Sequence, residues 1–168
     1  KVFTRCEKPY ELISVDSSRK FMKICEKRIR KFSKNHQKVK FKFSKSQMTK
    51  FNYRYCTEYI NHPQVIPDLI YIDGPSPFSI QNKIENFTIN SFGQMPMLCD
   101  VLKFEHFLTP GTIIILDGRT ANARFLKTNF QRDWKHLHNV YNDHHYFWLD
   151  EPSLGKHNTE QLKFYQKK

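Results

Sequence analysis

The sequence predicts an α/β fold with a mostly parallel sheet flanked by helices. Three apolar stretches, at residues 12–16, 68–73 and 112–117, each end on an aspartate. The second and third stretches are apolar on both faces, as strands in the interior of a parallel sheet are. Segments with helical spacing lie between the stretches, and the alternation of strand and helix is typical of this fold class.

A helix is expected directly after the first strand. Ser17 or Ser18 can cap it, because a serine oxygen accepts hydrogen bonds from the first free amides of a helix. Apolar side chains then recur every three or four residues over 18–32, which predicts one apolar face opposite a face of lysines and arginines. Residues 39–43 alternate phenylalanine or valine with lysine, which indicates a half-exposed strand.

The rest of the chain is expected to continue the alternation. Residues 46–64 fit either a strand or a helix. Pro75 and Pro77 end the strand at 68–73, because proline lacks the amide that a strand uses for pairing. Helices are predicted over 96–108 and 121–132, and closing strands over 145–150 and 161–166.

Length and composition fit one domain without a membrane span. The 168 residues are 39% hydrophobic, enough for a sizeable core. No apolar run approaches the ~18 residues that a spanning helix needs, and the first twelve residues hold no apolar segment typical of a signal peptide. The four cysteines are far apart without a CxxC pair, which indicates reduced thiols. We therefore expect a cytoplasmic domain.

Basic residues are concentrated in the first third of the chain. Residues 1–56 hold 17 Lys/Arg against 4 Asp/Glu, a net of +13, and residues 57–168 hold 11 against 12, a net of −1. Such a block can attract nucleic acid or an acidic membrane surface. The alternative is a solvated face formed by a helix and an edge strand.

The strand-terminal acids predict a ligand site. Parallel α/β sheets bind ligands beyond the carboxyl ends of their strands. Asp16, Asp73 and Asp117 each end a predicted strand, so we expect them along one edge of the sheet. The alternative is that they only end turns, as Asp-Gly pairs do in many proteins.

Three segments together resemble a known family. "ELISVDSS", "DLIYIDGP" and "FLTPGTIIILDGR" resemble the second, fourth and fifth strands of class I S-adenosylmethionine-dependent methyltransferases. The run "MPMLCDVLKFEHFLTPGTIIILDGRTANARFLKTNFQRDW" is also similar to uncharacterised bacterial methyltransferase-like proteins. The resemblance covers about residues 10–150 and implies a Rossmann-like sheet in a single methyltransferase-like domain, residues 1–168. The family's first strand and glycine-rich cofactor loop have no counterpart before residue 10, so the domain is expected to be N-terminally incomplete.

The resemblance also implies a cofactor, S-adenosylmethionine, and the residues that bind it. Asp16 matches the acid that holds the ribose hydroxyls, the same device that dinucleotide folds use. Ser17, Ser44 and Asp73 are the other expected cofactor contacts. Asp73 also borders the expected site of methyl transfer, where it is a candidate catalytic residue.

Metal-dependent members of the family bind a divalent ion between an acid after strand four and an acidic or amide pair after strand five. Asp73 and Asp117 match the two acids, and Gly118 replaces the next ligand. Carboxylate oxygens suit Mg²⁺ or Ca²⁺, and such an ion would make a substrate hydroxyl more nucleophilic. The alternative is that Asp117 only caps its turn and contacts Arg119 or Arg124.

Residues after the third acid are candidates for binding and catalysis. Arg119, Asn122 and Arg124 could bind an acidic or phosphorylated acceptor, since arginine matches carboxylate and phosphate geometry. Internal ion pairs are the alternative. His145 is a candidate catalytic base, because histidine titrates near neutral pH. It neighbours His144 in a predicted strand, so at most one of the two faces any site.

Three functions are compatible with these patterns. The first is a methyltransferase that methylates an oxygen of a small or glycan-like acceptor. The second is a nucleic-acid methyltransferase or basic nucleic-acid-binding module, based on the charge and aromatic residues of the first third. The third is a non-catalytic Rossmann-like subunit.

Overall fold

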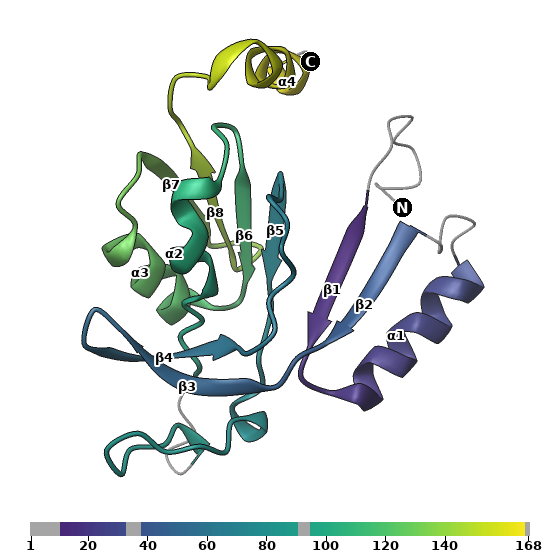
Figure 1. Cartoon of the computed structure of the whole chain (residues 1–168), viewed down its shortest axis with the longest axis vertical. Helices are drawn as coiled ribbons and strands as arrows, with labels where there is room; N and C mark the ends of the chain where they lie inside the picture. The colour runs from purple at the N-terminus through teal and green to yellow at the C-terminus, as the bar shows by residue number, and fades with distance from the viewer. Residues whose placement is uncertain (1–10, 33–37, 91–94, 167–168) are drawn as a thin grey trace.

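The computed structural model describes residues 11–32, 38–90 and 95–166 and shows a mixed α/β fold (Figure 1). Among these residues the strands form a parallel pair, an antiparallel hairpin and a four-stranded sheet. The parallel pair is β1 (Leu12–Asp16) and β2 (Val39–Phe43), and the hairpin is β3 (Ser46–Phe51) and β4 (Arg54–Tyr59). The third sheet has the order β5 (Leu69–Ile72), β6 (Ile113–Asp117), β8 (His144–Leu149), β7 (Trp134–Asn139).

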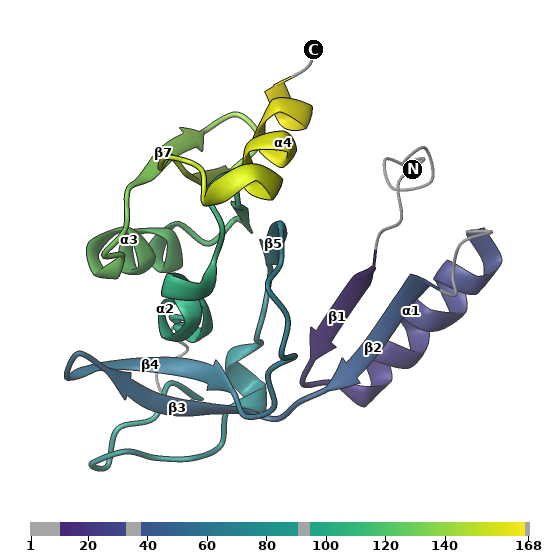
Figure 2. The same ribbon diagram turned by 45° about the horizontal axis from the view of Figure 1, so that its top comes forward.

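Helix α1 (Arg19–Phe32) connects β1 to β2, as the sequence predicts. Ser18 caps it, since the amide of Phe21 donates to the Ser18 hydroxyl at 3.3 Å. The amide of Ser18 donates in turn to Oδ1 of Asp16 at 2.7 Å, which fixes the turn between strand and helix. The views agree that α1 lies on the outer side of the β1–β2 pair, away from the four-stranded sheet (Figures 1 and 2).

Residues 46–59, which the sequence left open, form the β3–β4 hairpin. Its two loop residues, Asn52 and Tyr53, both have positive φ, at 48° and 62°. Two such residues give the turn whose twist matches that of the flanking strands. A small core of Met48, Ile80 and Ile89 lies under the hairpin.

The four-stranded sheet is parallel at β5 and β6 and antiparallel where β8 pairs with β6 and β7. The main core covers one of its faces, with side chains from α2 (Asp100–Phe104) and α3 (Thr120–Asn129) packed on the strands. Short 3-10 turns, η3 (Pro77–Ser79) and η5 (Glu105–Phe107), lie after β5 and α2. The predicted helix over 96–108 is thus shorter, and β7 is a strand that the sequence did not predict.

The opposite face of this sheet is open among the described residues. Five of its large apolar side chains are more than a third exposed: Leu69, Tyr71, Ile113, Leu137 and Trp148. Within the described ranges β1 pairs with β2 alone and β5 with β6 alone, so each leaves one strand edge unpaired. Parallel α/β sheets are normally covered on both faces. In the described residues this sheet is covered on one face only.

The predicted strand over 161–166 is wrong, because these residues belong to helix α4 (Gly155–Gln166). The helix lies at the amino ends of β5 and β6 (Figure 1). Asn158 Nδ2 donates to the carbonyl of Pro110 at 3.0 Å, and Nε2 of Gln161 donates to Oδ1 of Asp68. Leu162 packs against Gly111. Six residues are too few to distinguish a helical from a strand period. The residues that hold α4 in place lie far from it in the sequence, so they gave no local signal either. None of the helices in the described ranges is both long and apolar enough to cross a membrane.

Candidate functional site

The carboxyl ends of β1, β5 and β6 bring the three strand-terminal acids to one region. Ile72 pairs with Leu116 in the parallel register of β5 and β6, so the next residues, Asp73 and Asp117, leave the sheet at the same edge. Asp16 ends β1. The hydroxyl of Ser17 donates to the hydroxyl of Ser79 at 3.1 Å, which places the end of β1 beside the segment that follows β5.

Tyr59, the last residue of β4, lies among these acids. Burial raises the pKa of its hydroxyl, and the nearby carboxylates of Asp16, Asp100 and Asp73 raise it further. A Cβ atom at Gly74 would lie 2.7 Å from the Tyr59 oxygen, so the backbone after β5 passes directly by this hydroxyl. The carboxyl edge therefore holds a protonated hydroxyl between strand-terminal acids.

Arg119 provides a cation at the same edge. One of its guanidinium nitrogens donates to the backbone carbonyl of Asp73, and Nε lies 4.0 Å from Oδ1 of that residue. The side chain is 11% exposed, and its Nε has no hydrogen-bond partner in the part of the chain that the structure describes. The internal contact to Asp73 is thus formed, and the Nε–H donor is enclosed without a hydrogen-bond partner among the described residues. Arg124 lies on the exposed surface of α3.

Asp117 joins a tyrosine and a histidine on the open face of the sheet. Tyr71 donates its hydroxyl proton to Oδ2 of Asp117 at 2.5 Å, which raises the pKa of Tyr71 to about 12. His144 Nε2 lies 3.4 Å from Oδ1 of Asp117. The other ring nitrogen of His144 is buried and has no hydrogen-bond partner among the described residues. Asp117 therefore orients the ring of His144, whose second nitrogen is enclosed by the protein.

The structure places His145 on the opposite, closed face, where it is buried. Its Nε2 lies 3.0 Å from the Thr120 hydroxyl and its Nδ1 lies 3.1 Å from Nε2 of His136. Burial lowers the pKa of both His136 and His145, and the neighbouring imidazole of His138 lowers each further. His144, which pairs with Asp117 in the strand register, is the histidine at the carboxyl edge. Strand alternation predicts that at most one of the two histidines faces the site, and which one depends on the register.

Two other predicted site residues form internal hydrogen bonds. Ser44 is buried beside Asp16, and its hydroxyl accepts from the amide of Asn61 at 2.8 Å and donates to the carbonyl of Lys45 at 3.1 Å. The side chain of Asn122 is buried. Its Oδ1 accepts from the backbone amide of Leu98 at 3.0 Å, and its Nδ2 donates to the carbonyl of Leu98 at 3.1 Å. The structure therefore gives these side chains positioning roles and does not bring Asn122 to the edge.

The two acids expected to bind a metal ion already have protein groups beside them. Asp117 already bonds Tyr71 and His144, and the guanidinium of Arg119 lies near Asp73. In the described ranges no group of three or more His, Cys, Asp or Glu side chains is arranged to hold a metal ion. The fit to the predicted Mg²⁺ or Ca²⁺ is therefore poor.

Among the residues that the structure describes, Asp16 keeps one carboxylate oxygen free at the end of β1. Its Oδ1 accepts the Ser18 amide, while Oδ2 has no partner within the described ranges and the side chain is half-buried at the strand end. A carboxylate with one oxygen held by the protein and the other free can accept bonds from sugar hydroxyls. Ser17, next to it, is committed to Ser79.

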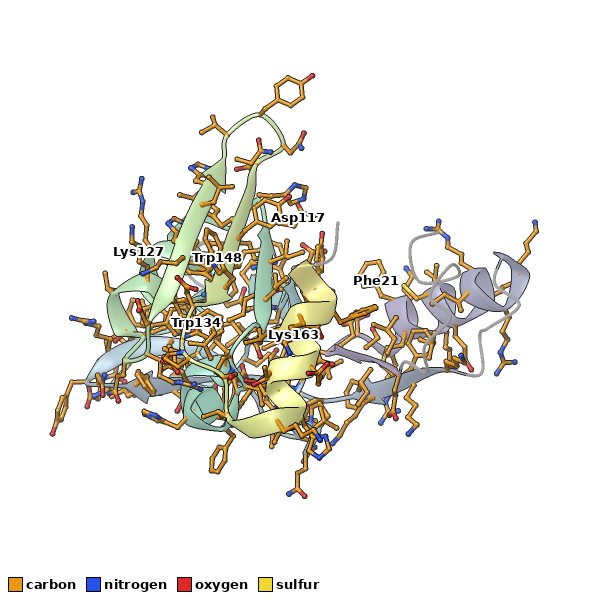
Figure 3. All side chains as sticks on the ribbon, turned by 90° about the horizontal axis from the view of Figure 1, so that it is seen from above. Phe21, Asp117, Lys127, Trp134, Trp148 and Lys163 are labelled. Atoms are coloured by element: carbon orange, nitrogen blue, oxygen red, sulfur yellow. The ribbon has the colours of Figure 1, made fainter. Side chains whose placement is uncertain are left out.

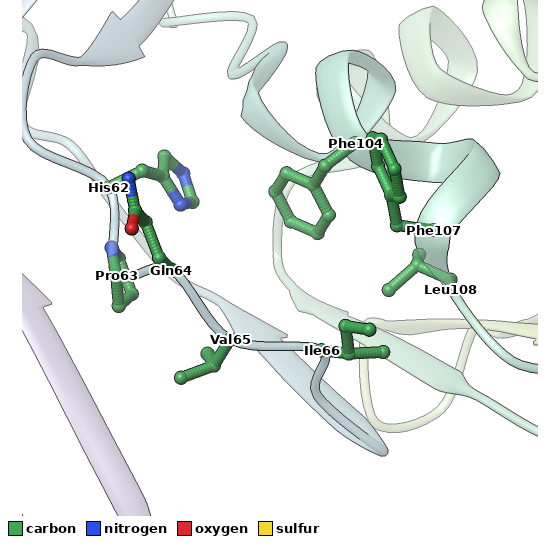
Figure 4. Close-up of a pocket in the computed structure, with 8 residues that line it drawn as sticks. All are labelled: His62, Pro63, Gln64, Val65, Ile66, Phe104, Phe107 and Leu108. Carbon is green, nitrogen blue, oxygen red and sulfur yellow. The ribbon is translucent and has the colours of Figure 1, made fainter.

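An apolar pocket lies away from these acids, between the segment before β5 and the turns before β6 (Figure 4). Its volume is about 380 Å³, and its lining is His62, Pro63, Gln64, Val65, Ile66, Phe104, Phe107 and Leu108. His62 is the titratable residue of this lining, and its Nε2 lies 2.7 Å from Oδ1 of buried Asp100. The pocket can take an apolar group beside the imidazole of His62.

Comparison with known proteins found no family model, no curated protein and no solved structure that matches the chain.

Proposed function

We propose that this chain is a class I methyltransferase-like domain that binds the adenosine end of S-adenosylmethionine beside β1. The acceptor is a hydroxyl of a small or glycan-like molecule. The observation that carries the proposal is the meeting of Asp16, Asp73 and Tyr59 at the carboxyl ends of the strands. Ligands of α/β sheets bind at this position, and a strand-terminal carboxylate recognises ribose there.

Different residues bind the cofactor and the acceptor. Asp16 accepts hydrogen bonds from the ribose hydroxyls through its free oxygen, and Asp73 lies toward the acceptor. The bound cofactor supplies an activated methyl group for attack by an oxygen. Asp73, whose side chain is 73% exposed, accepts the proton of the acceptor hydroxyl. Arg119 positions an acidic part of the acceptor.

Calorimetric titration with S-adenosylhomocysteine tests the proposal. We expect saturable binding, with adenosine as a better competitor than methionine, because the proposed cofactor contacts of Asp16 are to the ribose. A non-catalytic subunit is the second candidate function. It is favoured by the glycines of the described ranges, which lie singly and form no glycine-rich loop after a strand. If neither S-adenosylhomocysteine nor adenosine binds at millimolar concentration, the methyltransferase proposal is wrong and the second candidate replaces it.

A further inference from the structure

Helix α1 is amphipathic, and part of its apolar face stays exposed to solvent. Met22 and Ile29 are partly buried on the side that faces β1 and β2. Three further apolar side chains of the helix lie on the neighbouring side and face solvent. Phe21 is 59% exposed, Ile24 is 38% exposed and Cys25 is exposed. Figure 3 shows Phe21 on this outlying helix, separated from the four-stranded sheet.

These exposed residues form one continuous stripe, because positions three and four apart are neighbours on a helix. Phe21, Ile24 and Cys25 have this spacing, and Arg28 extends the stripe by one turn. A soluble helix normally turns its apolar arc to the core and its polar arc to water. In α1 part of the apolar arc faces outward, so this part is available to an apolar environment outside the chain.

Positive charge borders the stripe. The helix carries seven Lys/Arg side chains against the single acid Glu26, a net of +6. All seven basic side chains are exposed. Arg30 pairs with Glu26 at 2.6 Å, and Arg19 lies over the ring of Phe43 at 3.9 Å. The basic side chains without an ion pair among the described residues include Lys20, Lys23, Lys27 and Arg28.

We propose that α1 binds the surface of an anionic lipid bilayer. Phe21, Ile24 and Cys25 enter the headgroup boundary, while the flanking lysines extend to the anionic headgroups. Helices that lie in a membrane interface combine such an apolar stripe with a lysine- and arginine-rich face, and long basic side chains can place apolar stems in the interface and charges in water. Nucleic acid would pair with the basic side chains but would leave the aliphatic part of the stripe exposed to water. This inference is independent of the proposed methyltransferase activity.

Vesicle co-sedimentation tests the inference with vesicles of phosphatidylcholine, with and without phosphatidylserine. We expect the protein to bind the anionic vesicles at least about tenfold more tightly, since each basic residue near the surface contributes about fivefold. Phe21→Ser/Ile24→Ser should weaken this binding by about tenfold or more through loss of the inserted area. Lys20→Gln/Lys27→Gln should weaken it by about tenfold or more at low salt. The exposure of all four side chains predicts unchanged thermal unfolding.

Matched substitutions elsewhere serve as controls. Val140→Ser/Tyr141→Ser removes apolar groups that are 77% and 96% exposed in the β7–β8 turn, and Lys156→Gln/Lys163→Gln removes two charges from α4. Neither should change vesicle binding. Equal binding to both kinds of vesicle, or full binding by Phe21→Ser/Ile24→Ser, overturns the inference. It is also overturned if RNA displaces the vesicles at physiological salt and its binding depends on the lysines but not on Phe21 and Ile24.

Discussion

The hydroxyl of Tyr71 on β5 donates a 2.5 Å hydrogen bond to Oδ2 of Asp117 at the end of β6. The bond joins neighbouring strands across the carboxyl edge and holds one oxygen of the aspartate that orients His144. Charge-assisted bonds of this kind are short and strong, so the tyrosine stays protonated at high pH.

This bond predicts a loss of stability in alkali. The hydrogen bond to Asp117, together with burial, raises the pKa of Tyr71 from 10 to about 12. The unfolded chain therefore ionises first, and the contribution of Tyr71 to stability is complete below pH 10 and lost as the pH rises toward 12. In denaturant unfolding, Tyr71→Phe should lose less stability than wild type over this range. Tyr141→Phe, with a side chain 96% exposed, is the control and should follow wild type. An unchanged profile in Tyr71→Phe contradicts the assignment.

A buried carboxylate on the turn after α2 predicts a large loss of stability on substitution. Glu105 is 2% exposed and accepts hydrogen bonds from the amides of Gln131 and Arg132 and from Nε1 of Trp134. Removing the carboxylate leaves three partly buried donors without their partner. Glu105→Ala should lower the free energy of unfolding by about 3–5 kcal/mol in urea denaturation. The exposed Glu160→Ala should change it by less than about 0.5 kcal/mol. Equal effects in the two variants would show that this network is not formed.

Two glycines with positive φ test the docking of α4. Gly111 (φ 90°) lies against Leu162, whereas Gly155 (φ 75°) has no neighbouring atom within 4 Å of an added Cβ. Gly155→Ala should therefore show only the strain of the left-handed backbone, about 1–2 kcal/mol. Gly111→Ala should show the same strain and also the overlap with Leu162, which should lower the free energy of unfolding by a further ~1–3 kcal/mol. Thermal unfolding of both variants measures the difference. If Gly111→Ala is no worse than Gly155→Ala, α4 does not pack on this turn.

The parts of the fold with a local signal could be predicted from the sequence. Residues 12–16, 69–72 and 113–117 are strands ending at or just before an aspartate, because runs of apolar β-formers followed by acid and glycine carry that signal locally. The helix that Ser18 caps could also be predicted from a local signal. A strand such as β7 gave no signal, because its inward positions include Trp134, His136 and His138, whose polar rings obscure the apolar alternation.

The site was less predictable, since it depends on pairings between distant segments. That His144 rather than His145 reaches Asp117 follows from the β6–β8 register. That Asn122 clamps Leu98 depends on the position of a loop 24 residues away. Tyr59 was not predicted at all, because no local pattern places the end of a hairpin beside two strand ends.

The most direct test of the central claim is the affinity of Asp16→Asn for S-adenosylmethionine. Asparagine can keep the bond to the Ser18 amide that begins α1, but it removes the charge offered to the ribose. Hydrogen bonds to charged groups contribute about 1.5–3 kcal/mol each, so calorimetry should show binding weakened by about tenfold or more. Asp68→Asn, at the other end of β5, is the control and should bind as wild type does. If Asp16→Asn binds the cofactor as tightly as wild type, Asp16 does not hold the ribose and the proposed methyltransferase site is contradicted.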